Sequence, residues 1–130
     1  MVPLVKEKSI NKEVILNAAE IARTIVNAIE ERKGEDIVML DLQEVSPIAD
    51  YFVIATSDNE RMLRALVRNV DEEMGKTYQL RAKHVEGSPE SGWVLMDYSW
   101  VIVHLFSRLQ REFYRLENLW SDAPVVLRIQ

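Results

Sequence analysis

The residues best suited to catalysis surround a glycine-serine turn in the last third of the chain, where Glu86-Gly87-Ser88 is followed by Asp97. Nucleotidyltransferases use such a turn to hold a triphosphate, and they hold magnesium with two carboxylates on one strand face. The position two residues after Asp97 is Ser99, so the carboxylate pair is missing. Pro89 and Gly92 also predict a loop instead of a helix whose N-terminus receives phosphate. The pattern argues against an active nucleotidyltransferase and leaves a related fold open.

Other chemistry-bearing residues are isolated in the sequence. His84 and His104 stand alone within predicted strands, without the partner spacing of a metal motif. Asp41 and Asp50 flank the first two predicted strands, where an acid pair and simple solvated strand ends are both open interpretations. The chain has no cysteine, which excludes disulfides, thiolate metal sites and a cysteine nucleophile. We therefore expect a protein that is not an enzyme and that binds no metal or cofactor.

Length and charge restrict the class of protein. A chain of 130 residues suits one domain with one hydrophobic core. The net charge of −5 argues against coating nucleic acid through an overall basic field and favours basic protein partners, or simply solubility. The first residues lack a signal or transit pattern, and the apolar stretch at 98–103 is too short to span a membrane. We expect a soluble, cytoplasmic protein with no membrane association.

The first half of the chain predicts two helices and three strands. Apolar residues at helical spacing indicate a helix from Asn11, as its cap, to about Arg32, ended by Lys33 and a left-handed Gly34. Buried strands are predicted at 37–40 and 51–56. Ser57 and Glu60 match a capping box that begins a second helix, which Gly75 should end. Alternating residues at 78–85 predict a half-exposed strand.

The second half predicts a hairpin of two apolar strands, near 93–98 and 101–106, feeding a final helix. Ser107 and Gln110 match a second capping box, and the helix should bury Leu105, Leu109, Phe113, Leu116 and Trp120 and turn Arg111 to water. The expected order is α-β-β-α-β-β-β-α. This order indicates a single α/β domain, with a mixed five-stranded sheet packed with three helices. Residues 1–10 are expected to form an N-terminal arm, 11–123 the domain and 124–130 a C-terminal tail.

The strand beginning at Trp93 has two apolar faces. A period of two places Trp93, Leu95 and Asp97 on one face and Val94, Met96 and Tyr98 on the other. Alternation alone does not decide which face is core, or whether helices cover both faces and make Trp93 part of the core. An exposed face would present a large aromatic residue beside an acid, a composition typical of protein–protein contact sites.

Several blocks in this order resemble the ribosomal silencing factor, or Iojap-like, family. The resemblance covers about 14–123 and rests on these segments: Gly34-Glu35-Asp36-Ile37, Ser46 to Ile54, Glu86-Gly87, Gly92 to Asp97, Val101 to Phe106 and Arg111 to Trp120. It implies a nucleotidyltransferase-like fold without the catalytic acids. It also implies binding to the large ribosomal subunit through its protein number fourteen, which sterically blocks joining with the small subunit and represses translation, and a homodimer when free.

Carried over position by position, the resemblance implies that Trp93, Leu95, Asp97 and Tyr98 contact the partner, with Asp50 and Tyr51 as further candidates. No sequence-specific contact with nucleic acid is expected. An assembly factor using the same surface, or an enzyme of nucleotidyltransferase type, remain the alternatives. The chain departs from the family at Ser99-Trp100, where relatives carry Gly-Asp, and at Thr56-Ser57, where they carry Thr-Gly. We attribute the second change to Ser57 as a helix cap.

Overall fold

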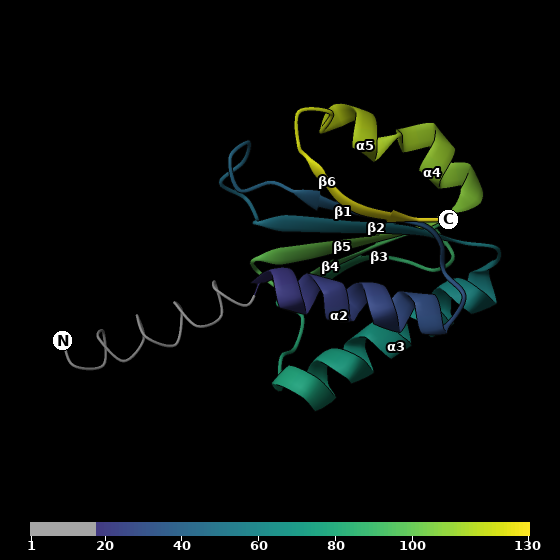
Figure 1. Ribbon diagram of the computed structural model, residues 1–130. Coiled ribbons are helices and arrows are strands. Elements are labelled where there is room, and N and C mark those ends of the chain that lie inside the picture. The colour runs from purple at the N-terminus through teal and green to yellow at the C-terminus, as the bar shows by residue number, and fades with distance from the viewer. Residues whose placement is uncertain (1–17) are drawn as a thin grey trace.

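The computed structural model describes residues 18–130, which form one α/β domain with helices on both faces of a sheet (Figure 1). Helices α2 and α3 lie on one face, and the short helices α4 and α5 lie on the other. The elements, in chain order, are α2 (Ala18–Glu31), β1 (Glu35–Asp41), β2 (Tyr51–Ser57), α3 (Glu60–Tyr78), β3 (His84–Ser88), β4 (Trp93–Asp97), β5 (Val101–Ser107), α4 (Arg108–Tyr114), α5 (Leu116–Leu119) and β6 (Val125–Ile129).

The sheet is mixed, with strand order β3-β4-β5-β2-β1-β6. β2 and β5 run parallel, and every other neighbouring pair is antiparallel. The prediction of an α/β fold with a mixed sheet is confirmed, but the sheet has six strands where five were expected. The sixth comes from the expected C-terminal tail, because Val125–Ile129 pairs with β1 and brings Leu127 opposite Met39.

The third strand and the end of the second helix differ from the prediction. α3 passes through Gly75 and continues to Tyr78, and left-handed Gln79 (φ 54°) then ends it. A side chain at position 75 would meet open space, so neither a tight contact nor a turn requires glycine there. The Tyr78 hydroxyl instead lies 2.9 Å from the Thr24 hydroxyl of α2, joining the two helices. β3 is consequently displaced along the chain to 84–88.

The helix ends partly follow the predicted caps. Ser107 caps α4 as expected, and its hydroxyl accepts the Gln110 N–H. The Ser57 prediction is wrong, because that residue is buried in β2 and Asn59 caps α3 by accepting the Met62 N–H at 2.8 Å. After α2, Lys33 rather than the predicted Gly34 adopts the left-handed conformation (φ 65°). The predicted Asn11 cap and N-terminal arm lie outside the described residues.

The last helix is broken, and its first part, α4, faces the opposite way from the prediction, whereas Leu116 of α5 is buried and Trp120 packs against the same cluster as predicted. Arg115 is left-handed (φ 45°), so the helix splits into α4 and α5. Arg111 points inward, bonding Glu117 at 2.6 Å and Thr56 of β2 at 2.7 Å. This polar anchor turns Leu109 and Phe113 outward, where they are 76% and 74% exposed. No helix among residues 18–130 combines the length and the apolar character that a membrane span requires.

Two apolar clusters fill the space on either side of the sheet. One joins α2 and α3 to the sheet and contains apolar side chains and two tyrosines, Tyr51 and Tyr98, with Leu66, Val70 and Met74 fully buried. The other lies under α4 and α5 and is rich in aromatic residues. The two faces of β4 contact different clusters and differ in burial, and the candidate site lies on the less buried face.

Candidate partner-binding surface

The two faces of β4 differ in burial, which decides the question that the sequence left open. Val94 and Met96 are each 1% exposed and belong to the cluster under α2 and α3. Trp93, Leu95 and Asp97 lie on the other face and are only half-buried. α4 packs over β5 and β2 and leaves the β3–β4 edge of this face partly uncovered. The half-exposed face is therefore the one that carries the tryptophan and the acid.

Trp93 belongs to a continuous group of aromatic rings. Its ring centroid lies 4.9 Å from that of Phe106 in β5 and 4.4 Å from that of Tyr114 in α4. Tyr114 in turn contacts Phe113 at 5.0 Å, edge to face. Because Phe113 is 74% exposed, the aromatic group runs from the protein interior to water. Such a half-buried aromatic surface is typical of sites that bury further area against a partner.

One buried polar side chain contacts Trp93 from below. His104 of β5 is 4% exposed, and its Nδ1 accepts a hydrogen bond from the Trp93 indole Nε1–H at 3.2 Å. Phe52 lies edge-on to the imidazole, 4.7 Å between centroids. Burial lowers the pKa of His104 to about 4, so the ring is neutral at neutral pH. The sequence predicted His104 only as a lone strand histidine.

A hollow of about 270 Å³ opens beside the indole. It is lined by Glu86, Gly87, Ser91, Trp93, Leu95, Gln110 and Tyr114. Gly87 is left-handed (φ 81°), and a Cβ there would lie 2.0 Å from the Trp93 carbonyl oxygen, so glycine is required. The Glu86-Gly87 block thus serves to bring β3 close against β4. An apolar side chain of a partner could enter the hollow against Leu95 and the rings.

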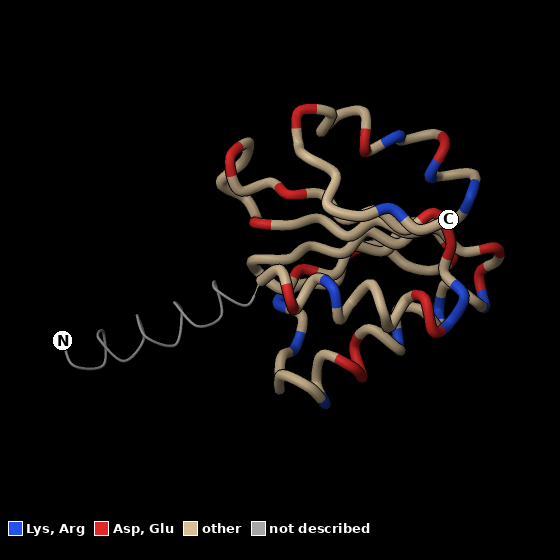
Figure 2. Tube along the Cα trace, in the orientation of Figure 1, with Lys and Arg blue, Asp and Glu red and all other residues tan. Residues whose placement is uncertain are grey.

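Two acids border this surface. Glu86 pairs across the strands with Leu95, which places it on the same face, and it is exposed. Asp97 pairs with His84 at the other end of the hairpin. Glu86 was not predicted as a contact residue, because the predicted strand ended at residue 85; β3 extends to Ser88 and places Glu86 on this face. Figure 2 shows mixed charges over α4 and acids in the connection between β1 and β2.

Asp97 also has a structural role in the turn between β4 and β5. Its carboxylate accepts the Ser99 N–H at 2.7 Å, and the Tyr98 N–H bonds the Val101 carbonyl at 2.9 Å. Ser99 is left-handed (φ 77°), a conformation that glycine adopts more readily than other residues. The turn therefore forms without glycine, and Trp100 packs against the cluster under α2 and α3.

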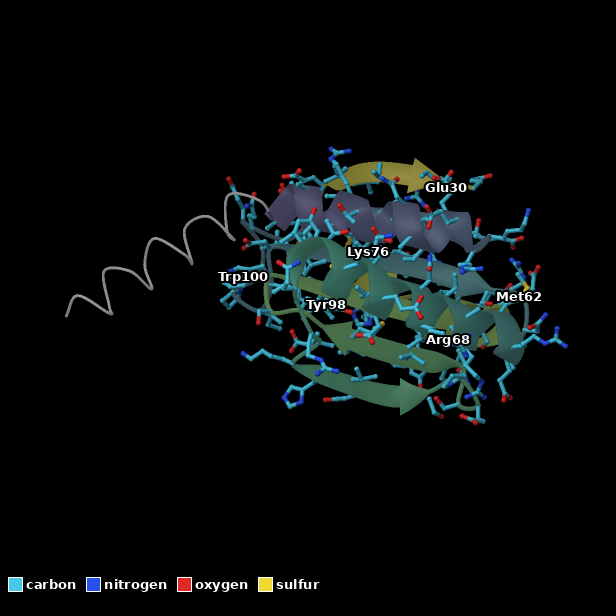
Figure 3. The ribbon with its side chains drawn as sticks, turned by 90° about the horizontal axis from the view of Figure 1, so that it is seen from below. Glu30, Met62, Arg68, Lys76, Tyr98 and Trp100 are labelled. Atoms are coloured by element: carbon cyan, nitrogen blue, oxygen red, sulfur yellow. The ribbon has the colours of Figure 1, made fainter. Side chains whose placement is uncertain are left out.

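Three of the sequence candidates lie elsewhere. Tyr98 and Tyr51 are 5% and 8% exposed and belong to the cluster under α2 and α3, so their assignment to the contact surface is corrected. In Figure 3, seen from the side of these helices, Tyr98 and Trp100 are both labelled on this side of the sheet. Asp50 is half-buried beside the β4–β5 turn, where burial and Asp41 raise its pKa, and its N–H bonds the Trp100 carbonyl.

The residues once considered for catalysis are not brought together. Ser88 pairs with Trp93 and Asp97 pairs with His84, which places Ser88 and Asp97 at opposite ends of the β3–β4 hairpin. Between Ala18 and Gln130 no three histidine, aspartate or glutamate side chains converge in a way that could hold a metal ion. The geometry of the described chain supports recognition of a partner by a surface.

Comparison with known proteins agrees with this reading. The model of the family described as "Ribosomal silencing factor during starvation" matches residues 15–130. The ribosomal silencing factor of Bacillus subtilis is 34% identical over 110 residues, covering 85% of this chain and 92% of that protein. Its counterpart from Halalkalibacterium halodurans is 36% identical over 110 residues, covering 82% and 91%.

A solved structure supports the same assignment. The crystal structure of protein CV0518 from Chromobacterium violaceum has a TM-score of 0.75 and 30% sequence identity, covering 79% of this chain and 85% of that one. The match to the family model spans the whole described domain, including the β3–β4 hairpin and the helices after β5. The chain therefore belongs to the ribosomal silencing factor family.

Proposed function

We propose that this protein binds the large ribosomal subunit through its protein number fourteen, in the cytoplasm, and sterically blocks joining with the small subunit. Family membership supports a ribosomal silencing role. The single observation that carries the choice of surface is the half-buried face of β4, where Trp93 and Leu95 are bordered by Glu86 and Asp97. Acids around an apolar centre are complementary to a basic, partly apolar protein patch.

The surface as proposed consists of Trp93, Leu95, Glu86, Asp97 and the aromatic residues Tyr114 and Phe113 of α4. Binding would cover the exposed part of the indole and the Phe113 ring, which are poorly shielded in the free protein. Buried aromatic anchors of this kind supply most of the affinity at protein–protein interfaces, while the acids at the rim contribute to orientation and association rate.

The first test changes Trp93. We expect Trp93→Ala to keep the fold and to weaken binding to isolated large subunits by about tenfold or more, equal to about 1.4 kcal/mol. The matched control is Trp100→Ala, because Trp100 packs on the opposite side of the sheet and should leave the affinity unchanged. Affinity is measured with purified subunits, and subunit joining is followed by sedimentation.

The outcomes separate the alternatives. Normal binding by a folded Trp93→Ala protein would remove this face from the proposal. Binding to large subunits without any effect on joining would favour the assembly-factor interpretation instead. Glu86→Lys tests the rim without disturbing the Asp97 turn, and its effect on affinity should shrink as salt is raised, because exposed charges are screened.

A further inference from the structure

His104 occupies a position where its polarity has a cost. It lies in β5 between Ile54 of β2 and Leu95 of β4, with Phe52 against its edge. Nδ1 accepts the Trp93 indole proton, so the proton of the neutral ring is on Nε2. Nε2 is buried and has no hydrogen-bond partner among the described residues. A buried donor without an acceptor destabilises the folded state, and phenylalanine would avoid that penalty.

The one hydrogen bond that the His104 side chain makes with the described residues, to the Trp93 indole, is the feature that phenylalanine would lack. The indole of Trp93 also contacts the tilted rings of Phe106 and Tyr114, and such ring contacts are less directional than a hydrogen bond. A hydrogen bond to a strand-mounted acceptor is directional, and His104 is itself held by neighbouring strands on both sides. The bond selects one orientation of an indole whose outer part is open to solvent.

We propose that His104 is a positioning residue that holds Trp93 in the orientation that the partner recognises. This inference rests on the proposed function, because it takes the Trp93 surface as the binding surface. The partner class is the same basic, partly apolar protein patch. Fixing a contact side chain before binding lowers the entropy that association must otherwise overcome, which strengthens binding without adding a contact.

Two substitutions of His104 separate positioning from structural support. His104→Phe keeps the ring and removes the acceptor, so we expect unchanged or greater resistance to unfolding and about two- to tenfold weaker binding to isolated large subunits, the range of one net hydrogen bond. His104→Asn places a carbonyl oxygen near the position of Nδ1 but leaves space, so we expect weaker folding and binding closer to wild type. A purely structural residue would change folding and binding together.

A double-mutant cycle makes the test specific. In a Trp93→Phe background the indole N–H is absent, so His104→Phe should no longer alter affinity. The same loss of affinity in both backgrounds, or no loss in either, would overturn the proposal.

A readout without the partner keeps this inference distinguishable from the proposed function. The Trp93 indole N–H should exchange slowly with solvent in the wild type and faster in His104→Phe, as measured by NMR on tryptophan-labelled protein. Fast exchange in the wild type would overturn the hydrogen bond itself. Slow exchange in a wild-type protein that does not bind large subunits would instead overturn the proposed function, and with it the role of the bond in recognition.

Discussion

The two faces of the sheet are covered by different means. On one face, α2 and α3 provide 14 and 19 helical residues and bury a continuous set of apolar side chains. On the other, α4 and α5 provide only 7 and 4 residues, and α4 is anchored by the polar Arg111 contact with Glu117 and Thr56. The first face is closed, and the second leaves aromatic side chains half-exposed along β4.

This difference favours the face under α2 and α3 as the main source of stability, and we propose the face under α4 as the recognition surface. Apolar burial contributes roughly 25 cal/mol per Å², so the continuous cluster under α2 and α3 supplies much of the driving force for folding. The face under α4 contains His104, whose Nε2 has no hydrogen-bond partner within residues 18–130, and exposes Leu109, Phe113 and Leu119 to water. None of these features favours folding. We propose that a partner covers this exposed apolar area.

The largest expected effect comes from making the same substitution on both faces. Leu66 of α3 is fully buried, so Leu66→Ala should lower the free energy of unfolding by about 2–5 kcal/mol, through lost burial and the cavity left behind. Leu109 of α4 is 76% exposed, and Leu109→Ala should change the free energy of unfolding by less than about 0.5 kcal/mol. Denaturant unfolding of both variants makes the measurement.

Equal losses for the two leucines would break the comparison, because they would mean that α4 contributes to the core as fully as α3 does. Affinity for large subunits provides a second measurement on the Leu66 variant. Where Leu66→Ala remains folded, it should bind normally, since the substitution lies on the far side of the sheet from Trp93.

A second prediction concerns pH and the buried histidine of the recognition face. The pKa of His104 is lowered to about 4 by burial, from 6.5 in an unfolded chain, so the unfolded state binds this proton first as pH falls. Through this group the free energy of unfolding is unaffected above pH 6.5 and falls progressively as the pH drops toward 4, by up to about 3 kcal/mol. The effect of His104 is isolated by comparing the free energies of unfolding of the wild type and His104→Phe between pH 7 and 4.

The carboxylates change the stability of both proteins alike, so the difference between the two pH curves belongs to His104. A constant difference across this window would show that the imidazole is protonated as easily in the folded protein as in the unfolded chain. The buried aromatic surroundings would then have to be more open to water than the contacts with Phe52 and Trp93 indicate.

The closed face was the more predictable of the two from sequence. Helical spacing of apolar residues predicts α2 and α3, and continuous apolar runs predict β1, β2 and β5, because each element buries its pattern in the ordinary way. The failures lie where a single polar contact overrides the pattern. Arg111 turns the predicted apolar face of α4 outward, and Asn59 caps α3 in place of Ser57.

The candidate site was only partly predictable for a related reason. The period of two placed Trp93, Leu95 and Asp97 together, but burial of the opposite face could not be read from a strand that is apolar on both sides. Tyr98 and Tyr51 were carried over by resemblance and lie in the core. The edge strand β6 was missed because the short segment after Pro124 becomes a strand by pairing with β1, which is distant in the sequence.

The smallest expected effect concerns the turn that joins β4 to β5. Ser99 is left-handed (φ 77°), which costs an L-residue about 1–2 kcal/mol, whereas glycine accepts it freely and loses part of that gain through its more flexible unfolded state. Ser99→Gly should therefore raise the free energy of unfolding by about 0.5–1 kcal/mol. Affinity for large subunits should not change, because the Asp97 carboxylate still accepts the N–H of residue 99. Thermal unfolding with a parallel binding assay measures both, and a stabilised variant with altered affinity would show that this turn, and not only the Trp93 end of β4, belongs to the recognition surface.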